Sequence, residues 1–237
     1  MWLIAEYQPV TLFSFRSGMA TSSGAKTLFL PTPFAIRTAL LDAAIRTNGL
    51  AAGLAAFDWI KELSIAVRPP ERLVVTNLFA KILKPTRKEE TEHAMDRSIA
   101  FREYAQLEGA LALAFSPTGE QAGELTMLLA QINYFGKRGS FFQLKTIPDA
   151  VHELPEGFVL MDGVCVQGTQ VSGQVPKTFV AGLIQMMDDW GESLTFAKAN
   201  IYTDEKMVVG KDRVRKSVVL PYRLVRSSKS FSYYERV

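Results

Sequence analysis

A glycine turn with two adjacent cations joins a helix-like segment to a strand-like segment at residues 131–144. Gly136 and Gly139 stand three residues apart, and because glycine tolerates positive φ the chain can fold there into a small concavity of N–H groups. Lys137 and Arg138 lie between them, at the tip. The turn follows a helix, whose C-terminus carries partial negative charge, so an anion held here would depend on the two cations and the turn N–H groups. The alternative is a glycine C-cap whose cations suit the helix dipole.

The segments around this turn predict an α+β fold. Thr32 is a suitable N-cap with Pro33 at the first helical position, and Asn48-Gly49 is a suitable end for that helix. The coarse order over residues 2–147 is strand, helix, strand, strand, helix, strand, which is the order of a ferredoxin-like unit. A polar stretch at residues 84–97 interrupts it as an exposed excursion. Residues 148–237 predict a β-rich extension, with short strands at 157–166, 196–201, 218–226 and 231–237.

Composition excludes several classes of protein. The chain has 237 residues and a net charge of +3. From Lys206 onward it contains nine Lys and Arg residues but only two acidic residues, so this end is locally basic. The single cysteine, Cys165, excludes an internal disulfide and a cysteine-based zinc site. No apolar run reaches membrane-spanning length and no signal-peptide pattern is present, so we expect a cytoplasmic protein with no membrane contact.

Catalysis has little support in the sequence. His93 and His152 are the two histidines, and neither comes with a partnering pattern. The acidic pairs Asp188-Asp189 and Glu89-Glu90 have no metal-ligand spacing and are expected to be solvated surface charges. We therefore expect no catalytic residue, metal or cofactor.

RNA binding has more support. Three cationic stretches, at residues 16–26, 81–88 and 137–138, are predicted to flank one sheet. Single-stranded RNA is typically held by cations along its backbone and by aromatic rings that stack on its bases. Core packing is the alternative for each aromatic residue near these stretches. These residues are Phe13, Phe15, Tyr134, Phe135, Phe141 and Phe142.

Three places in the chain resemble the fifth CRISPR-associated (Cas) protein family, within the repeat-associated mysterious protein (RAMP) superfamily. Residues 29–44, FLPTPFAIRTALLDAA, resemble the proline-led first helix of that family. Residues 131–140, QINYFGKRGS, resemble its glycine-rich loop after the second helix. The polar excursion stands where the family inserts a thumb hairpin.

This resemblance implies a non-enzymatic subunit of a type I CRISPR interference (Cascade) complex in antiviral defence. Such a subunit caps the five-prime handle of the guide RNA (crRNA), contacts the backbone and large Cas subunits, and meets target DNA only indirectly. It also implies a ferredoxin-like RAMP domain at 1–147, a thumb-like insertion at about 77–100 and an extension at 148–237. The expected RNA-binding residues are Arg16, Lys26, Arg37, Lys81, Lys84, Arg87, Lys88, Tyr134, Gly136, Lys137, Arg138, Gly139 and Ser140.

Two other functions stay open from the sequence. One subtype of the family cleaves precursor RNA with tyrosine, lysine and histidine side chains, and Tyr104, Lys137 and His93 leave a metal-independent endoribonuclease possible. A ferredoxin-like small-molecule enzyme is the third hypothesis, because that fold hosts many activities.

Overall fold

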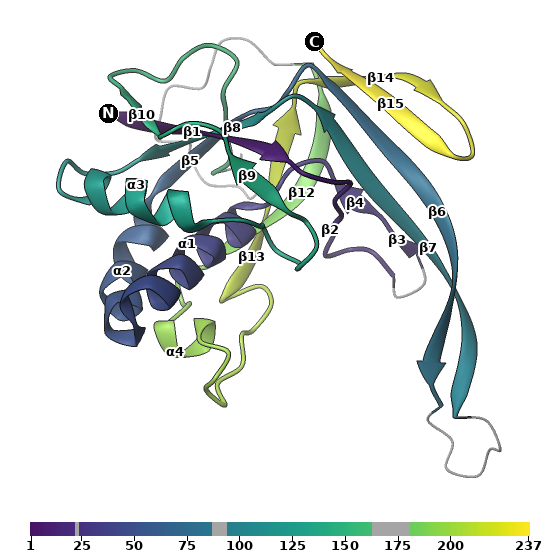
Figure 1. Cartoon of the computed structure of the whole chain (residues 1–237), viewed down its shortest axis with the longest axis horizontal. Coiled ribbons are helices and arrows are strands. Elements are labelled where there is room, and N and C mark those ends of the chain that lie inside the picture. The colour runs from purple at the N-terminus through teal and green to yellow at the C-terminus, as the bar shows by residue number, and fades with distance from the viewer. Residues whose placement is uncertain (22–23, 87–93, 163–180) are drawn as a thin grey trace.

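The structure is a computed structural model that describes residues 1–21, 24–86, 94–162 and 181–237, and it shows a mixed α/β protein with several sheets (Figure 1). In chain order its elements are β1 (Trp2–Pro9), β2 (Phe15–Arg16), β3 (Gly24–Ala25), β4 (Thr27–Leu28), α1 (Pro33–Asn48), α2 (Leu50–Glu62), β5 (Ser64–Arg68), β6 (Arg72–Pro85), β7 (Met95–Glu108), β8 (Leu111–Ser116), α3 (Gln121–Gln131), β9 (Phe142–Leu144), β10 (Asp149–Val151), β11 (Val159–Leu160), β12 (Leu183–Trp190), α4 (Phe196–Ala199), β13 (Arg213–Leu220), β14 (Tyr222–Ser227) and β15 (Phe231–Arg236). No helix in these described ranges is long and apolar enough to cross a membrane.

The main sheet has the strand order β10-β1-β8-β5-β11, with β9 also paired to β1 and every pairing antiparallel. Helices α1, α2 and α3 lie together on one side of it (Figure 1). β1 alternates, burying Leu3, Ala5 and Tyr7, whereas β8 is buried from Leu111 to Phe115. The Tyr7 hydroxyl donates a 2.7 Å hydrogen bond to the carbonyl of Leu129 near the end of α3, and burial raises the pKa of this phenol. The main sheet and α3 therefore share one hydrophobic core.

Helix α1 begins and ends as predicted. The Thr32 hydroxyl accepts a 3.2 Å hydrogen bond from the N–H of Ala35, Pro33 is the first helical residue, and Gly49 follows the last with φ +86°. The cap satisfies a backbone donor that the helix leaves unpaired.

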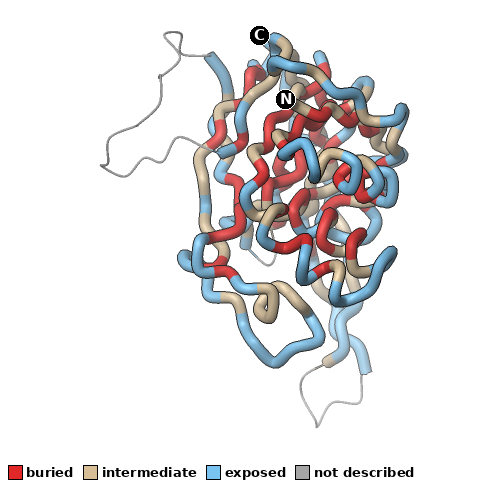
Figure 2. The backbone as a smooth tube through the Cα atoms, turned by 90° about the vertical axis from the view of Figure 1, so that its left-hand side faces the viewer, coloured by how far each residue is buried: buried red, intermediate tan, exposed pale blue. Residues whose placement is uncertain are grey.

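Strands β6 and β7 form a long hairpin that extends away from the body (Figure 1). Their pairing runs from Arg72 opposite Glu108 to Pro85 opposite Met95. Beyond Val75 most side chains of β6 are exposed, and Figure 2 shows the buried residues gathered in the body instead. The described ends of the excursion predicted at 84–97 thus belong to the distal part of a longer hairpin, and residues 87–93 lie outside the described range.

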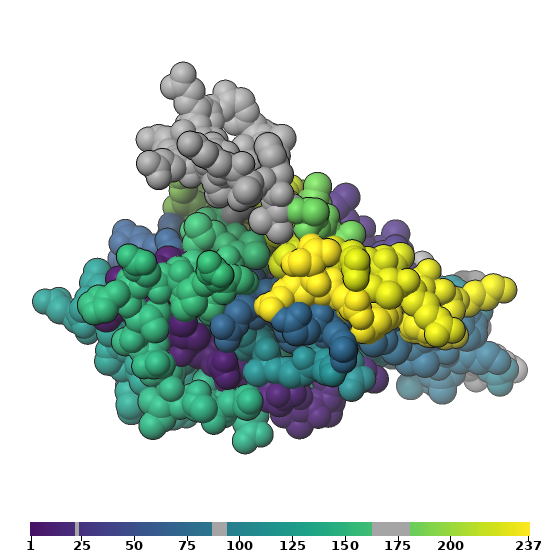
Figure 3. All heavy atoms as spheres, turned by 90° about the horizontal axis from the view of Figure 1, so that it is seen from above, coloured from purple at the N-terminus to yellow at the C-terminus, as the bar shows by residue number. Residues whose placement is uncertain are grey.

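Segments after residue 147 join sheets built by earlier residues. β10 pairs with β1, β11 with β5, and β15 with β6. In the view of Figure 3, β14 and β15 lie along the surface beside the start of β6. The boundary at residue 147 stays a prediction.

This C-terminal part differs from the sequence prediction in two places. Residues 196–199 form the short helix α4, not a strand, because the Thr195 hydroxyl caps it by accepting from the N–H of Lys198. No strand was predicted at Leu183–Trp190, where β12 pairs with β13 over its whole length and packs against α1. The last residue of β12, Trp190, also stacks on Phe57 of α2, with ring centroids 5.0 Å apart.

Candidate functional site

The glycine turn forms as a tight, exposed loop after α3. The N–H of Phe135 donates to the carbonyl of Ser140 at 3.4 Å, and the N–H of Ser140 donates to the carbonyl of Lys137 at 3.1 Å. Gly136 has φ +64° and Gly139 has φ +102°, so both glycines adopt the left-handed backbone that the sequence predicted.

Two cations occupy the tip of this turn. Lys137 and Arg138 are exposed, and within the described part of the chain neither forms an ion pair. Tyr134, at the base of the turn, is half-buried. The two side chains are therefore free to meet a phosphate.

Helix termini next to the turn favour an anion more than the sequence suggested. The guanidinium of Arg46 donates at 3.0 Å to the carbonyl of Gln131, so a cation offsets the negative end of α3. Gly136 lies close to Ala35 in the first turn of α1, where an added Cβ would be 3.7 Å from the Ala35 Cβ. The first turn of a helix carries partial positive charge. The turn thus lies beside the favourable end of one helix and a neutralised end of another.

The loop at residues 16–26 adjoins the same turn. The ring of Phe15, in β2, lies close to Gly136, where an added Cβ would be 3.8 Å from it. Strand β2 pairs with β4, and β3 pairs in parallel with β7. Arg16 and Lys26 are both exposed on this loop, which the pairing of β2 with β4 closes. The Arg16 guanidinium also donates to the carbonyls of Ala20 and Thr21, at 3.1 and 3.3 Å. Two of the three predicted cationic stretches are therefore neighbours.

The third stretch lies on the long hairpin. Lys81 and Lys84 are exposed on β6, opposite Ile99 and Asp96 of β7. Arg87 and Lys88, predicted with them, lie outside the described residues, as does His93.

Two predicted RNA contacts are corrected. Arg37 is only 4% exposed: its guanidinium is 2.9 Å from a carboxylate oxygen of Asp189 and donates to the carbonyls of Ile60 and Leu63 at the end of α2. Ser140 is 3% exposed, and its hydroxyl accepts from the N–H of Ser14 at 3.5 Å. Both side chains point into the protein, where they hold elements together, and neither is displayed on the surface as an RNA contact would require.

The expectation of a solvated Asp188-Asp189 pair was also wrong, since these residues are 6% and 2% exposed. Asp189 accepts from Arg37 and, at 2.8 Å, from Lys216. Asp188 pairs with Arg213 and Arg215. These contacts use three cations of the basic C-terminal part, which lie on β13 beside the two acids of β12. Three cations within four residues, at 213–216, were the signal that could have found them.

This charged network also reaches the loop at 16–26. The Arg215 guanidinium donates at 3.2 Å to the carbonyl of Gly18. An added Cβ on Gly18 would lie 3.4 Å from both carboxylate oxygens of Asp188. The β12–β13 ribbon therefore supports the loop that carries Arg16 and Lys26.

Most of the aromatic residues near the site belong to the core. Four of the six form one buried cluster with ring centroids 4.9 to 6.0 Å apart. They are Phe13, Phe15, Phe135 and Phe142. Phe141, in contrast, is 45% exposed beside the glycine turn.

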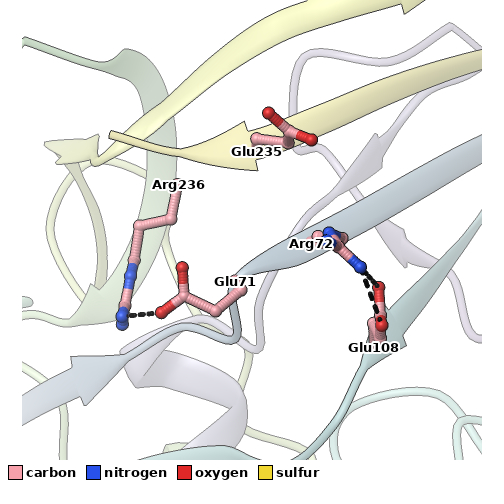
Figure 4. Close-up of a pocket in the computed structure, with 5 residues that line it drawn as sticks. All are labelled: Glu71, Arg72, Glu108, Glu235 and Arg236. Atoms are coloured by element: carbon pink, nitrogen blue, oxygen red, sulfur yellow. Dashed lines mark hydrogen bonds and ion pairs between the residues drawn. The ribbon is translucent and has the colours of Figure 1, made fainter.

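A hollow of about 480 Å³ lies elsewhere, at the base of the long hairpin (Figure 4). Its lining contains three carboxylates and two guanidinium groups: Glu71, Glu108, Glu235, Arg72 and Arg236. Arg72 pairs with Glu108 at 3.1 Å, and Arg236 pairs with Glu71. A hydrogen bond from Tyr233 holds the pKa of Glu235 below its usual value. Both guanidinium groups of the lining are paired with its carboxylates, and Glu235 pairs with Arg223, so no cation of this lining is left for a phosphate.

Comparison with known proteins gives one match in sequence. A CRISPR-associated protein Cas5 of Archaeoglobus fulgidus is 30% identical over 95 residues, which is 40% of this chain and 42% of that relative. The aligned part therefore spans less than half of the curated relative's length. No protein-family profile matches the chain.

Solved structures give weaker likenesses. A CRISPR protein from Archaeoglobus fulgidus is 14% identical with a TM-score of 0.43, covering 100% of this chain and 92% of its own. A chain of a CRISPR RNA-guided surveillance complex is 15% identical with a TM-score of 0.40, covering 100% and 91%. Over the 95 aligned residues the chain is similar in sequence to a CRISPR-associated protein Cas5, the family that its motifs resemble.

Proposed function

We propose that this chain is an RNA-binding structural subunit of a type I CRISPR interference complex, where it caps the five-prime handle of the guide RNA. Its other partners are the backbone and large Cas subunits, and it meets target DNA only through the assembled complex. Its role in this proposal is non-enzymatic. The sequence relation to Cas5 supports the CRISPR-associated part of the proposal.

The observation that carries RNA binding is the pair of exposed cations at the tip of the glycine turn. Lys137 and Arg138 have no acidic partner in the described part of the chain, unlike Arg213, Arg215 and Lys216. The first turn of α1 lies beside them, and the loop with Arg16 and Lys26 adjoins them. A sugar-phosphate backbone supplies repeated negative charge that such a surface can track.

We further propose that the main sheet is a ferredoxin-like RAMP core and that β6 and β7 are its thumb-like insertion. The order β9-β1-β8-β5, with all pairings antiparallel, supports this reading. So does the place of α1 and α2 between β1 and β5, and of α3 between β8 and β9. Lys81 and Lys84 then extend the RNA-contacting surface onto the hairpin.

The test is RNA binding by a variant in which Lys137→Ala and Arg138→Ala are combined, measured against salt concentration. Each phosphate contact on single-stranded RNA contributes about 0.7 to the slope of log affinity against log salt, so the double variant should lower that slope by roughly 1.4. The matched control combines Lys206→Ala with Lys211→Ala, which removes the same charge from two exposed residues of the segment after α4. Equal slopes for both double variants would remove the glycine turn from the RNA site.

The same samples test the non-enzymatic part of the proposal. Repeat-derived RNA incubated in chelator with the purified protein should be retarded and remain intact. Cleavage under these conditions would replace the scaffold by a metal-independent endoribonuclease, and Tyr104 and Lys137 would be the next residues to mutate.

A further inference from the structure

A row of side chains lies at the base of the glycine turn. Tyr134 and Phe141 face each other across an antiparallel bridge, and their chain neighbours exchange backbone hydrogen bonds of 3.4 and 3.0 Å on either side. A pair flanked in this way is of the non-hydrogen-bonded kind, in which side chains share one face with Cβ atoms about 4.5 to 5.5 Å apart. The two aromatic side chains therefore start from adjacent points on one surface.

The burial of the next pair shows which way this surface faces. Phe135 and Ser140, one step closer to the tip, are 0% and 3% exposed. Because successive residues point to opposite faces, Tyr134 and Phe141 project outward. The 45% exposure of Phe141 agrees with that direction.

A third residue extends the row on the other side of Phe141. The N–H of Val10 donates at 3.0 Å to the carbonyl of Phe141, which continues the register in which Pro9 lies opposite Phe142. Val10 is 59% exposed. The outer row of Tyr134, Phe141 and Val10 thus crosses three adjacent segments, a width of about 10 Å. A hydrogen bond to Phe141 on one side, and hydrogen bonds of its chain neighbours Ser140 and Phe142 on the other, hold this segment of backbone in place.

We propose that this outer row is a platform on which one unpaired base of the bound RNA stacks, while Lys137 and Arg138 hold an adjacent phosphate. This inference rests on the proposed function and names the form of RNA at that site. A flat aromatic surface beside cations is the combination that holds single-stranded nucleic acid. Bases inside a duplex are already stacked on one another, so the platform favours an unpaired segment. The two neighbouring cations favour this occupant over an apolar protein segment.

The test compares two single-stranded RNAs of equal length, one with all its bases and one with abasic sites at several consecutive positions. Wild-type protein should bind the complete RNA more tightly. Phe141→Ala should weaken binding of the complete RNA roughly 5- to 150-fold, the range for losing one stacked base, and leave binding of the abasic RNA unchanged. It should not alter the salt slope, because no cation is removed.

Phe141→Trp keeps an aromatic face and should retain the affinity of the wild type for the complete RNA. The control is Tyr202→Ala, which removes an aromatic side chain that is 89% exposed on the segment after α4. It should change neither affinity. Thermal melts of each variant establish that it is folded.

Each remaining outcome overturns the inference in a distinguishable way. If Phe141→Ala weakens binding of both RNAs equally, the side chain supports the turn and does not stack on a base. If Phe141→Ala weakens binding of neither RNA, while Lys137→Ala with Arg138→Ala flattens the salt slope, the proposed function stands and the platform fails. If Phe141→Ala in that case also prevents assembly with protein subunits, the outer row is a protein contact. If wild-type protein binds neither RNA, the proposed function fails, and the platform with it.

Discussion

Replacing Arg37 by methionine should cost more stability than replacing any exposed cation of this chain. The guanidinium is buried and has three protein partners: the Asp189 carboxylate and the carbonyls of Ile60 and Leu63. Methionine retains much of the aliphatic volume, so the change removes the charge and its hydrogen bonds. Asp189 keeps Lys216 and the N–H of Trp190, both at 2.8 Å, whereas the two carbonyls lose a donor.

Losing one partner of a buried ion pair costs about 3 to 5 kcal/mol, and each buried acceptor left unpaired contributes about 1 to 3 kcal/mol. These figures describe overlapping effects, so we expect a total of about 3 to 5 kcal/mol. At a urea m-value of about 3 kcal/mol/M this lowers the unfolding midpoint by about 1 to 1.7 M. Equilibrium unfolding in urea, followed by tryptophan fluorescence, measures this shift.

Arg46→Met is the matched control on the same helix. Arg46 pairs with Asp42 four residues earlier, and the two side chains are 47% and 42% exposed. Such pairs contribute about 0.3 to 0.5 kcal/mol, so the midpoint should hardly move. If Arg37→Met unfolds at the same urea concentration as wild type but flattens the salt dependence of RNA binding, the structural role that we assign to Arg37 is refuted.

Two further predictions concern backbone and charge. Gly136→Ala and Gly139→Ala should each lower stability by about 1 to 2 kcal/mol, since both glycines have positive φ. Gly123→Ala, within α3, should instead raise stability by about 0.5 to 1 kcal/mol. A loss of stability for all three variants in urea unfolding would contradict this reasoning. Hydrogen bonds from the N–H of Val208 and from Lys198 hold the pKa of Asp212 below its usual value, so the stability it contributes is present above about pH 4 and is lost as pH falls further. Melting temperatures of Asp212→Asn and wild type should therefore differ at pH 7 and converge toward pH 3, and a constant difference would exclude this linkage.

Features that depend on neighbouring residues could be predicted from the sequence. The cap at Thr32, the proline after it and the glycine after Asn48 define α1 through contacts within a few residues. Gly136 and Gly139 likewise mark a turn through their own backbone freedom. Such helix caps and turns depend only on residues a few positions apart, so a short stretch of sequence is enough to predict them.

Features that depend on residues far away in the sequence could not be predicted from it. Arg37 lies 152 residues from Asp189, so nothing near it in the sequence distinguishes a buried arginine from an exposed one. The cations that pair with Asp188 and Asp189 on β13 lie 25 to 27 residues further along the chain, so the two acids resembled a solvated pair. The exposure of Phe141, in turn, depends on its register with Tyr134 and Val10, which a periodic pattern does not specify.

The most direct test of the central claim is to locate the RNA on the protein. A single-stranded, repeat-derived RNA with a photoreactive uridine near its five-prime end is bound and cross-linked, and the modified peptides are mapped by mass spectrometry. We predict cross-links within residues 134–141 and 16–26 that disappear when Lys137→Ala is combined with Arg138→Ala. Cross-links confined to other segments, or unchanged in this variant, would contradict the account.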